Sequence, residues 1–267
     1  MPKVHINNHD MYYEIHGEGD PAICMGGWGT YCHGGTGNLA RGLTDKYQTL
    51  LIDYRGIGES TDDESVPATM KLHADDVMGL LDHLGWSNVR FIGLVGMGAC
   101  IAQEVAIQRP ELVRSMVNMG CWAAVDKYLE DQLDMFRIVH RDLGFEAFQR
   151  FVCFMSFLPE YYNQNHGKLI GPDGPWSELR DRVNTHWRLV DACISHDVVD
   201  QLPQVQTPTL VLHAAKDMVT SPRYTGQIEE LLPNTEGVTM AEVAHVVAGK
   251  EQKIKFCEIL FDFLERH

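Results

Sequence analysis

Histidine and cysteine are the residue types in this chain whose spacing could reveal metal binding, disulfide bonds or thiol nucleophiles. The sequence contains 13 histidines and seven cysteines, but no C-x-x-C pair and no H-E-x-x-H segment. The cysteines are odd in number and widely separated, which favours reduced thiols in a reducing compartment. They stand at Cys24, Cys32, Cys100, Cys121, Cys153, Cys193 and Cys257. We therefore expect neither a bound metal nor any other cofactor.

Three closely spaced glycines, Gly93, Gly96 and Gly98, precede an apolar helical segment and superficially resemble a dinucleotide-binding loop. Their order differs from G-x-G-x-x-G, however, and the acidic ribose-binding residue expected about 20 residues later is missing. Met116 and Asn118 occupy that zone, and the chain has no G-x-x-x-x-G-K-[ST] segment. A nucleotide is therefore not expected.

Composition restricts the partners of the protein. Its 267 residues (30.2 kDa) are 45% hydrophobic and 22% charged, which is typical of a globular chain with a substantial core. The formal net charge is −15, whereas nucleic acids and anionic membranes need a basic face. No apolar run approaches the roughly 20 residues of a membrane helix, and the first residues lack the apolar stretch of a signal peptide. We expect a cytoplasmic protein with a small-molecule substrate and no nucleic-acid or membrane partner.

Short runs of residues predict the sheet that must position any functional site. Residues 3–7 and 11–16 alternate in polarity around Asn-His-Asp, which predicts an antiparallel hairpin. Later runs are mainly apolar, as in strands buried on both faces of a parallel sheet. These runs cover residues 22–25, 49–52, 89–92, 116–119 and 209–212. Amphipathic helical patterns at 72–84, 99–108 and 252–265 complete the prediction of a right-handed, doubly wound α/β fold.

Residues 123–202 break this alternation and predict a helical insertion. No strand-like run occurs there, and aromatic residues are dense among helical patterns. An insertion at the carboxyl ends of the strands would cover the place where α/β sheets bind ligands. The aromatic residues are Phe136, Phe145, Phe148, Phe151, Phe154, Phe157, Tyr161, Tyr162, Trp176 and Trp187, and most of them are expected to form the core of the insertion.

Nearly the whole chain resembles the α/β-hydrolase family. The resemblance rests on five signals in the right order. They are Gly26-Gly27-Trp28-Gly29, the Asp-Tyr-Arg-Gly-Ile-Gly-Glu-Ser of residues 53–60, the strand–turn–helix around Gly96, Asp217 after a late strand, and His245 before the last helix. It implies a mostly parallel sheet with an N-terminal antiparallel hairpin, a core of residues 1–122 and 203–267, and a helical cap of residues 123–202. Asp53 and Arg55 are expected to be scaffold residues.

The family places its nucleophile in the sharp turn G-x-S-x-G. Here the following helix matches so well that the nucleophile position falls on Gly96, where no serine stands. Shifting the motif so that Gly93 comes first puts Val95 there instead, which supplies no nucleophile either. Cys100 lies four residues beyond Gly96, too deep to replace a residue of the turn, and is interpreted as a small core thiol.

The resemblance gives His245 the role of general base and Asp217 that of the acid which orients it. The alternatives are a surface histidine and a solvated loop carboxylate. Backbone N–H groups of Gly27, Trp28 and Met97 would form an oxyanion hole. Trp122, His186 and Trp187 are the expected substrate-binding residues. His33, His140, His196, Trp176 and Arg188 could also line the pocket, although packing or surface roles are expected for any one alone.

Three function classes remain open. The first is a hydrolase of a small ester, lactone, amide or enamine, in which His245 and Asp217 activate water directly and Gly96 leaves room for it. The chain is similar to aminoacrylate hydrolases and to enol-lactonase-like proteins. Its similarity to the aminoacrylate hydrolases includes the missing serine and the segment Asn118–Trp122. The second class is a cofactor-independent lyase or oxygenase, and the third is a non-catalytic binding protein. A homodimer is left open.

Overall fold

The computed structural model describes residues 3–29, 33 and 35–267, and in this part of the chain a single mixed sheet forms the centre of the fold. Cys32, named above, lies outside the described residues, and so do the first two residues of the chain. The eight strands follow the order β1-β2-β4-β3-β5-β6-β7-β8. They are β1 (Lys3–Ile6), β2 (His9–His16), β3 (Asp20–Met25), β4 (Tyr47–Ile52), β5 (Val89–Gly93), β6 (Val113–Met119), β7 (Thr209–Ala214) and β8 (Thr235–Met240). Strands β1 and β2 pair antiparallel, β2 joins β4 antiparallel, and the remaining neighbours are parallel.

Helices cover both faces of this sheet. Apolar residues of α2 and α3 belong to the core on one face, and those of α1 and α9 to the core on the other. The helices are α1 (Leu43–Lys46), α2 (Met70–Leu84), α3 (Met97–Gln108), α4 (Lys127–Leu143), α5 (Phe145–Ser156), α6 (Pro159–Leu169), α7 (Val183–Ile194), α8 (Pro222–Leu231) and α9 (Lys250–Arg266). Four 3₁₀ turns, η1 (Thr36–Asn38), η2 (Pro110–Leu112), η3 (Ser177–Leu179) and η4 (Leu202–Gln204), complete the described elements.

The apolar runs of the central strands follow from this double cover. In β3, Ile23 packs into the core under α2 and α3, while Cys24 packs into the core under α9. In β5, Phe91 packs into the core under α2 and α3, and Ile92 packs into the core under α9. Successive side chains of a strand point to opposite faces, so a strand covered on both sides is apolar at most positions.

The predicted fold class is confirmed by the sheet and by its N-terminal hairpin. The sequence reading missed β8, which has mostly exposed or half-buried side chains at the sheet edge and therefore lacks an apolar run. It also missed the short helices α1 and α8. Helix boundaries differ by a few residues at most: the pattern at 72–84 corresponds to α2, which begins earlier because the Thr69 side chain accepts a hydrogen bond from the Leu72 amide.

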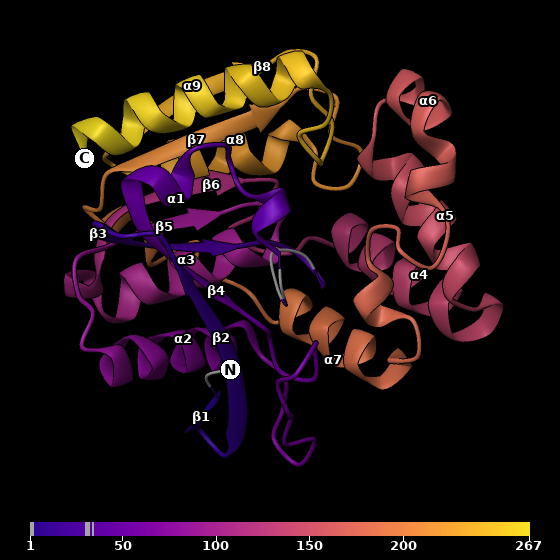
Figure 1. Ribbon diagram of the computed structural model, residues 1–267, viewed down its shortest axis with the longest axis horizontal. Coiled ribbons are helices and arrows are strands. Elements are labelled where there is room, and N and C mark those ends of the chain that lie inside the picture. Colours follow the sequence, from indigo (N-terminus) through magenta and orange to yellow (C-terminus); the bar gives the residue numbers. More distant parts are fainter. Residues whose placement is uncertain (1–2, 30–32, 34) are drawn as a thin grey trace.

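Between β6 and β7 the chain forms α4, α5, α6 and α7, in the segment for which a helical insertion was predicted. Figure 1 shows these helices gathered on one side of the molecule, opposite the C-terminus. One isolated bridge between Ala124 and Asp197 joins the two ends of the segment. Below, "the cap" denotes residues 123–202.

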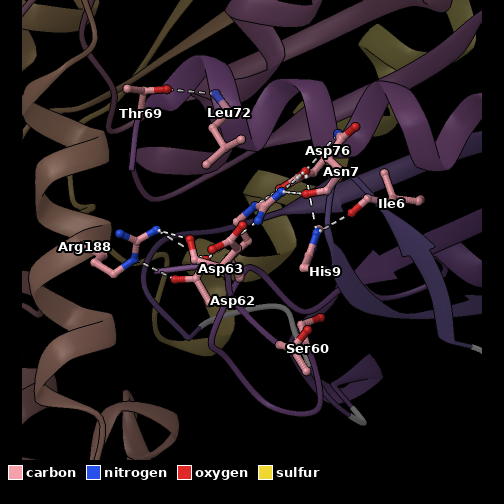
Figure 2. A network of polar contacts seen from close by, with 12 residues as sticks. Ile6, Asn7, His9, Ser60, Asp62, Asp63, Thr69, Leu72, Asp76 and Arg188 are labelled. Carbon is pink, nitrogen blue, oxygen red and sulfur yellow. Dashed lines mark hydrogen bonds and ion pairs between the residues drawn. The ribbon is translucent and has the colours of Figure 1, made fainter. Parts of the chain in front are cut away.

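A buried ionic network ties the N-terminal hairpin to α2. The guanidinium of Arg55, 3% exposed, donates from Nε to Asp76 Oδ2 (2.6 Å) and from Nη2 to Asp76 Oδ1 (2.8 Å). Nη2 also donates to the Asn7 carbonyl at 2.7 Å, and the Asn7 amide donates to Asp76 at 3.0 Å (Figure 2). These contacts agree with the scaffold role expected of Arg55.

The same network continues into the cap through Asp62. Its Oδ1 lies 3.8 Å from Arg55 Nη1, and its Oδ2 accepts a hydrogen bond from Arg188 Nε of α7 at 2.7 Å. Figure 2 shows Arg188 reaching from its helix to Asp62 and Asp63. The core and the cap are therefore joined by charged groups next to the turn after β4.

We predict that Asp76→Asn lowers the free energy of unfolding by about 3 kcal/mol, because Arg55 would keep a buried charge without its bidentate carboxylate. Urea denaturation measures the change. The matched control is Asp75→Asn on the same helix, whose carboxylate pairs with exposed Lys71 and should cost less than about 1 kcal/mol. Equal losses in the two variants would contradict a stabilising role for the buried network.

Candidate functional site

The turn between β5 and α3 has an unusual backbone. Gly96, directly before α3, has φ +86° and ψ −97°, outside the regions open to residues with a side chain. Val95 before it has φ +56°, which is rare for a β-branched residue. The turn therefore brings the chain sharply from the sheet into the helix, with Gly96 buried at its tip.

The surroundings of this turn are tight. A Cβ atom on Gly96 would lie 3.2 Å from the Gly120 carbonyl oxygen and 3.2 Å from Cζ3 of the Trp122 ring. A Cβ on Gly98 would approach the Met25 carbonyl oxygen to 2.3 Å, so only glycine lets α3 come this close to β3. Trp122 thus occupies the space that a side chain at position 96 would enter.

The glycine-rich turn after β3 is fixed by hydrogen bonds on its outer side. The Gly26 carbonyl accepts one from the Gly98 amide (3.0 Å) and one from the Tyr54 hydroxyl (2.9 Å). In a trans peptide the carbonyl and the next N–H point in opposite directions. The Gly27 amide therefore faces away from Tyr54, and Gly27 itself lines the cavity described below.

Beside this turn, His245 and Asp217 form a buried hydrogen bond. The distance from His245 Nδ1 to Asp217 Oδ2 is 2.9 Å, and each residue is 6% exposed. Asp217 Oδ1 accepts from the amides of Val219 and Thr220, both at 2.8 Å. The Thr220 hydroxyl donates to Asp217 Oδ2 (3.1 Å) and lies 3.2 Å from His245 Nδ1. The carboxylate is thereby held in one orientation, and Nδ1 of the histidine is directed toward it.

Two neighbours set the position of the imidazole. A Cβ atom on Gly120, the residue after β6, would lie only 3.1 Å from His245 Cε1, so the glycine lets the ring approach the sheet. Val246, the residue after His245, donates a hydrogen bond from its amide to the carbonyl of Ser156 at the end of α5 (3.1 Å). The loop that carries His245 is therefore attached to both the sheet and the cap.

A cavity of about 40 Å³ lies among these elements, between the sheet and the cap. A water molecule needs roughly 10–15 Å³ of such volume, so the cavity has room for a water and a small organic group. Apart from Thr220, His245 and cysteine, the described side chains that line it are apolar. The lining consists of Gly27, Trp28, Val95, Gly96, Met97, Trp122, Leu133, Phe136, Val152, Trp176, Cys193, Val219, Thr220 and His245.

The cysteines near the cavity are protonated thiols. Cys100 is fully buried, its thiol donates to the Trp122 carbonyl, and burial raises its pKa well above the usual value. Cys193 does line the cavity, but burial raises its pKa to about 12 and its sulfur accepts a hydrogen bond from Trp28 Nε1 at 3.4 Å. A thiol with so high a pKa is a poor nucleophile at neutral pH.

Trp28 also anchors the cap on the core. Its ring contacts Phe136 of α4 and His186 of α7, with centroid distances of 5.8 and 4.8 Å. His186 in turn lies 3.0 Å from His140 between their Nδ1 atoms. Burial lowers the pKa of His186 to about 3 and lowers that of His140, so both rings are neutral at pH 7 and one can donate to the other.

Two expected substrate-binding residues lie elsewhere. His186 is fully buried behind Trp28 and is absent from the described cavity lining. Trp187 is also absent from it, and its ring lies instead against the guanidinium groups of Arg137 and Arg141. Successive residues of a helix point about 100° apart, so an inward-facing His186 turns Trp187 outward.

The other expected site residues come together. Gly27, Trp28, Gly96, Met97, Trp122 and His245 line one cavity, and Asp217 lies directly behind His245. Sequence reasoning missed Thr220 and Gly120, although both follow a strand at the same edge of the sheet as His245.

Among the described residues, no group of three or more histidine, cysteine, aspartate or glutamate side chains could hold a metal ion. No helix in the described ranges is long and apolar enough to cross a membrane.

We predict that His186 makes stability depend on pH. Its pKa is about 3 in the folded protein and near 6.5 when unfolded, so below pH 6.5 the unfolded chain binds the additional proton. As the pH is lowered from 6 to 4, this residue should therefore reduce the free energy of unfolding by about 1.4 kcal/mol per pH unit. His186→Gln should remove that part of the slope in urea denaturation series, while His166→Gln, at an exposed position, should leave it. Identical slopes in all three proteins would refute the prediction.

The sequence is similar over most of its length to proteins that are named as hydrolases. A family profile described as alpha/beta hydrolase fold matches residues 21–251. A putative carbamate hydrolase RutD of Azorhizobium caulinodans is 29% identical over 252 residues, which cover 93% of this chain and 91% of that protein. A putative carbamate hydrolase RutD of Pseudomonas savastanoi pv. phaseolicola is 24% identical over 222 residues, covering 83% and 85%.

Solved structures share the fold. MGS-M2, an alpha/beta hydrolase enzyme from a Medee basin deep-sea metagenome library, has a TM-score of 0.87 at 22% identity and covers 99% of this chain and 97% of its own. The enol-lactonase from Burkholderia xenovorans LB400 has a TM-score of 0.85 at 21% identity, with coverage of 99% and 100%. The profile match, which spans most of the chain and agrees with the fold described above, shows that this protein belongs to the α/β-hydrolase family.

Proposed function

We propose that the protein is a hydrolase of a small carbonyl compound in which His245 activates water directly. The observation that carries the proposal is the buried hydrogen bond between His245 and Asp217, with the imidazole lining a cavity beside Gly96. Membership of the α/β-hydrolase family supports hydrolysis as the reaction class.

His245 is the general base of this mechanism. Because Nδ1 is bound to Asp217, Nε2 is the nitrogen available on the cavity side. It takes a proton from water as the water oxygen attacks the carbonyl carbon. Asp217 holds the tautomer and stabilises the imidazolium that forms. When the tetrahedral intermediate collapses, the imidazolium returns its proton to the leaving group.

Backbone amides stabilise the oxyanion of the intermediate. Met97 is the first residue of α3, so its N–H has no partner one turn earlier in the helix. The N-terminus of this helix also carries partial positive charge. The turn at Gly27 and Trp28 faces the same cavity and is held from behind through the Gly26 carbonyl. Preorganised donors of this kind need no side chain at position 96.

The residues around Gly96 support direct attack by water over a covalent intermediate. Gly96 has no nucleophile, and the nearby thiols of Cys100 and Cys193 are protonated because burial raises their pKa. Removing the nucleophile of such a site leaves general-base and oxyanion terms that still accelerate hydrolysis. The names of the putative carbamate hydrolases support a substrate in which a carbonyl carries an oxygen or nitrogen leaving group.

We expect a neutral substrate. Among the described cavity-lining residues there is no lysine or arginine, and a carboxylate buried without a cationic partner would be strongly disfavoured. The small volume also favours few-atom acyl groups.

The first prediction concerns the base. His245→Ala should lower kcat by about 10²–10⁴-fold, the usual contribution of a positioned proton acceptor. Asp217→Asn should also slow the reaction, because the imidazole loses the carboxylate that fixes its tautomer. KM should change much less in both variants. Steady-state kinetics with a reactive short-chain ester measure this, with exposed His83→Ala as control, and an unchanged kcat in His245→Ala would remove the basis of the mechanism.

The second prediction restores a nucleophile. Gly96→Ser should be acylated by p-nitrophenyl acetate, because base and oxyanion donors already surround the position. Gly96→Ala is the matched control, since it imposes the same backbone strain of roughly 1–3 kcal/mol and the same contact with Trp122 but carries no hydroxyl. Intact-protein mass spectrometry should find an acetyl adduct on the serine variant only. If folded Gly96→Ser acquires no acetyl group, His245 does not act at this turn.

The third prediction concerns substrate charge. Methyl propionate should be hydrolysed with a kcat/KM roughly 10²-fold higher than monomethyl succinate, whose free carboxylate would have to be buried. Product analysis at several salt concentrations checks that the preference persists when long-range charge effects are screened. Comparable kcat/KM values for the two esters would contradict the neutral-substrate assignment.

A further inference from the structure

A second hollow lies immediately outside the small cavity. This outer cleft has a volume of about 530 Å³ and is lined by core and cap residues, including Phe157, Tyr161, Glu178, Val247 and Lys253. Two residues, Val95 and Trp176, line both the outer cleft and the inner cavity. The two spaces are thus neighbours separated by these side chains.

Trp176 is the larger of the two separating residues and is only 5% exposed. Its ring packs edge-on against Phe157, with centroids 6.4 Å apart. Its backbone has φ +63° and ψ +11°, the left-handed conformation that residues with bulky side chains seldom adopt. The chain therefore holds an indole at this boundary in spite of an unfavourable backbone conformation.

The segment before Trp176 is fixed by one buried side chain. Gln149 of α5, 1% exposed, donates from Nε2 to the carbonyls of Gly171 and Pro175, both at 3.0 Å, and accepts from the Gly171 amide at 2.9 Å. On the other side, a Cβ atom on Gly29 would lie 3.1 Å from Cβ of Glu178, so the turn after Trp176 packs closely against the loop that follows β3. The position of the indole is thereby set from both sides.

The two spaces differ in chemistry. The inner cavity contains His245 and is otherwise mainly apolar, whereas the outer cleft includes the charged side chains of Asp173, Glu178 and Lys253. A small apolar acyl group fits the inner space. A longer chain attached to the reacting carbonyl would have to pass the position of the indole to reach the outer one.

We infer that Trp176 determines the length of the substrate: its indole stands between the inner cavity and the outer cleft and limits the acyl group to one that fits the inner cavity. Without the indole, the inner cavity and the outer cleft would form one continuous binding site. The effect of Trp176 on which substrates are hydrolysed rests on the proposed hydrolysis by His245, whereas its limit on the length of a bound ligand does not.

Trp176→Gly is the most suitable test variant, because glycine removes the indole and also adopts the positive φ of this position without strain. Trp176→Phe retains an aromatic ring but shortens it, and serves as a second variant that keeps more of the packing. Trp187→Ala is the matched control: it removes an indole from the same cap, but one that lies outside both described linings. Circular dichroism and urea denaturation establish that each protein is folded.

The first readout is kcat/KM for p-nitrophenyl esters from acetate to octanoate. In the parent protein and in Trp187→Ala, kcat/KM should fall as the acyl chain lengthens. In Trp176→Gly the ratio of octanoate to acetate should rise at least about tenfold, corresponding to a few newly accommodated methylene groups, and Trp176→Phe should lie between. An unchanged ratio in Trp176→Gly, or an equal change in Trp187→Ala, would overturn the inference.

The second readout does not depend on hydrolysis. Calorimetric titration with methyl ketones from 2-butanone to 2-nonanone, which present a carbonyl but no leaving group, measures the length limit alone. Trp176→Gly should bind the long ketones more tightly than the parent by a similar factor. If this shift occurs in a protein that hydrolyses no ester, the length limit stands and the proposed function fails. If the ketones bind parent and variant with the same length dependence, or bind neither, the inference is wrong.

Discussion

The backbone turn at Gly96 constrains everything built at the carboxyl edge of the sheet. With φ +86° and ψ −97°, the turn directs the chain from β5 into α3 so abruptly that Met97, the first residue of the helix, lines the cavity. A side chain at the tip would be strained and would also press on Trp122. Glycine removes both costs while keeping the turn, so the proposed mechanism needs no side chain at this position.

The polar groups of the site are few, and Asp217 and the Gly26 carbonyl are each held by more than one hydrogen bond. Asp217 accepts four hydrogen bonds, from two backbone amides, from the Thr220 hydroxyl and from His245. The Gly26 carbonyl accepts two, from Tyr54 and Gly98. The site therefore depends on preorganised dipoles inside an apolar wall, where electrostatic interactions are stronger than in water.

The cap closes this arrangement through contacts of different kinds. Trp28 inserts between Phe136 and His186, and the amide of Val246 binds the end of α5. Arg188 of α7 reaches the buried charges of the β4 turn through Asp62. Because the His245 loop and the turn after β3 both touch the cap, its position and the geometry of the site are linked.

Much of the fold was predictable because buried strands and amphipathic helices leave strong patterns. The double cover of the sheet makes Ile23 and Cys24 both apolar, whereas the exposed edge strand β8 leaves no such run and was missed. Site residues that follow strands, such as Asp217 and His245, could be proposed from their place in the chain. The orientation of cap residues could not, because it depends on how α7 is rotated against Trp28. This rotation buries His186 and turns Trp187 away from the cavity.

The absence of a covalent intermediate is the central claim of the proposed mechanism. Its most direct test is a single-turnover rapid-quench experiment in H₂¹⁸O, with enzyme in excess over a neutral ester and both products and the intact protein followed by mass spectrometry. If water attacks directly, acid and alcohol appear together in one phase, the acid carries one oxygen from the solvent, and the protein never gains mass. Release of the alcohol ahead of the acid, with an acylated protein between them, would contradict direct attack, and so would an acid without solvent oxygen.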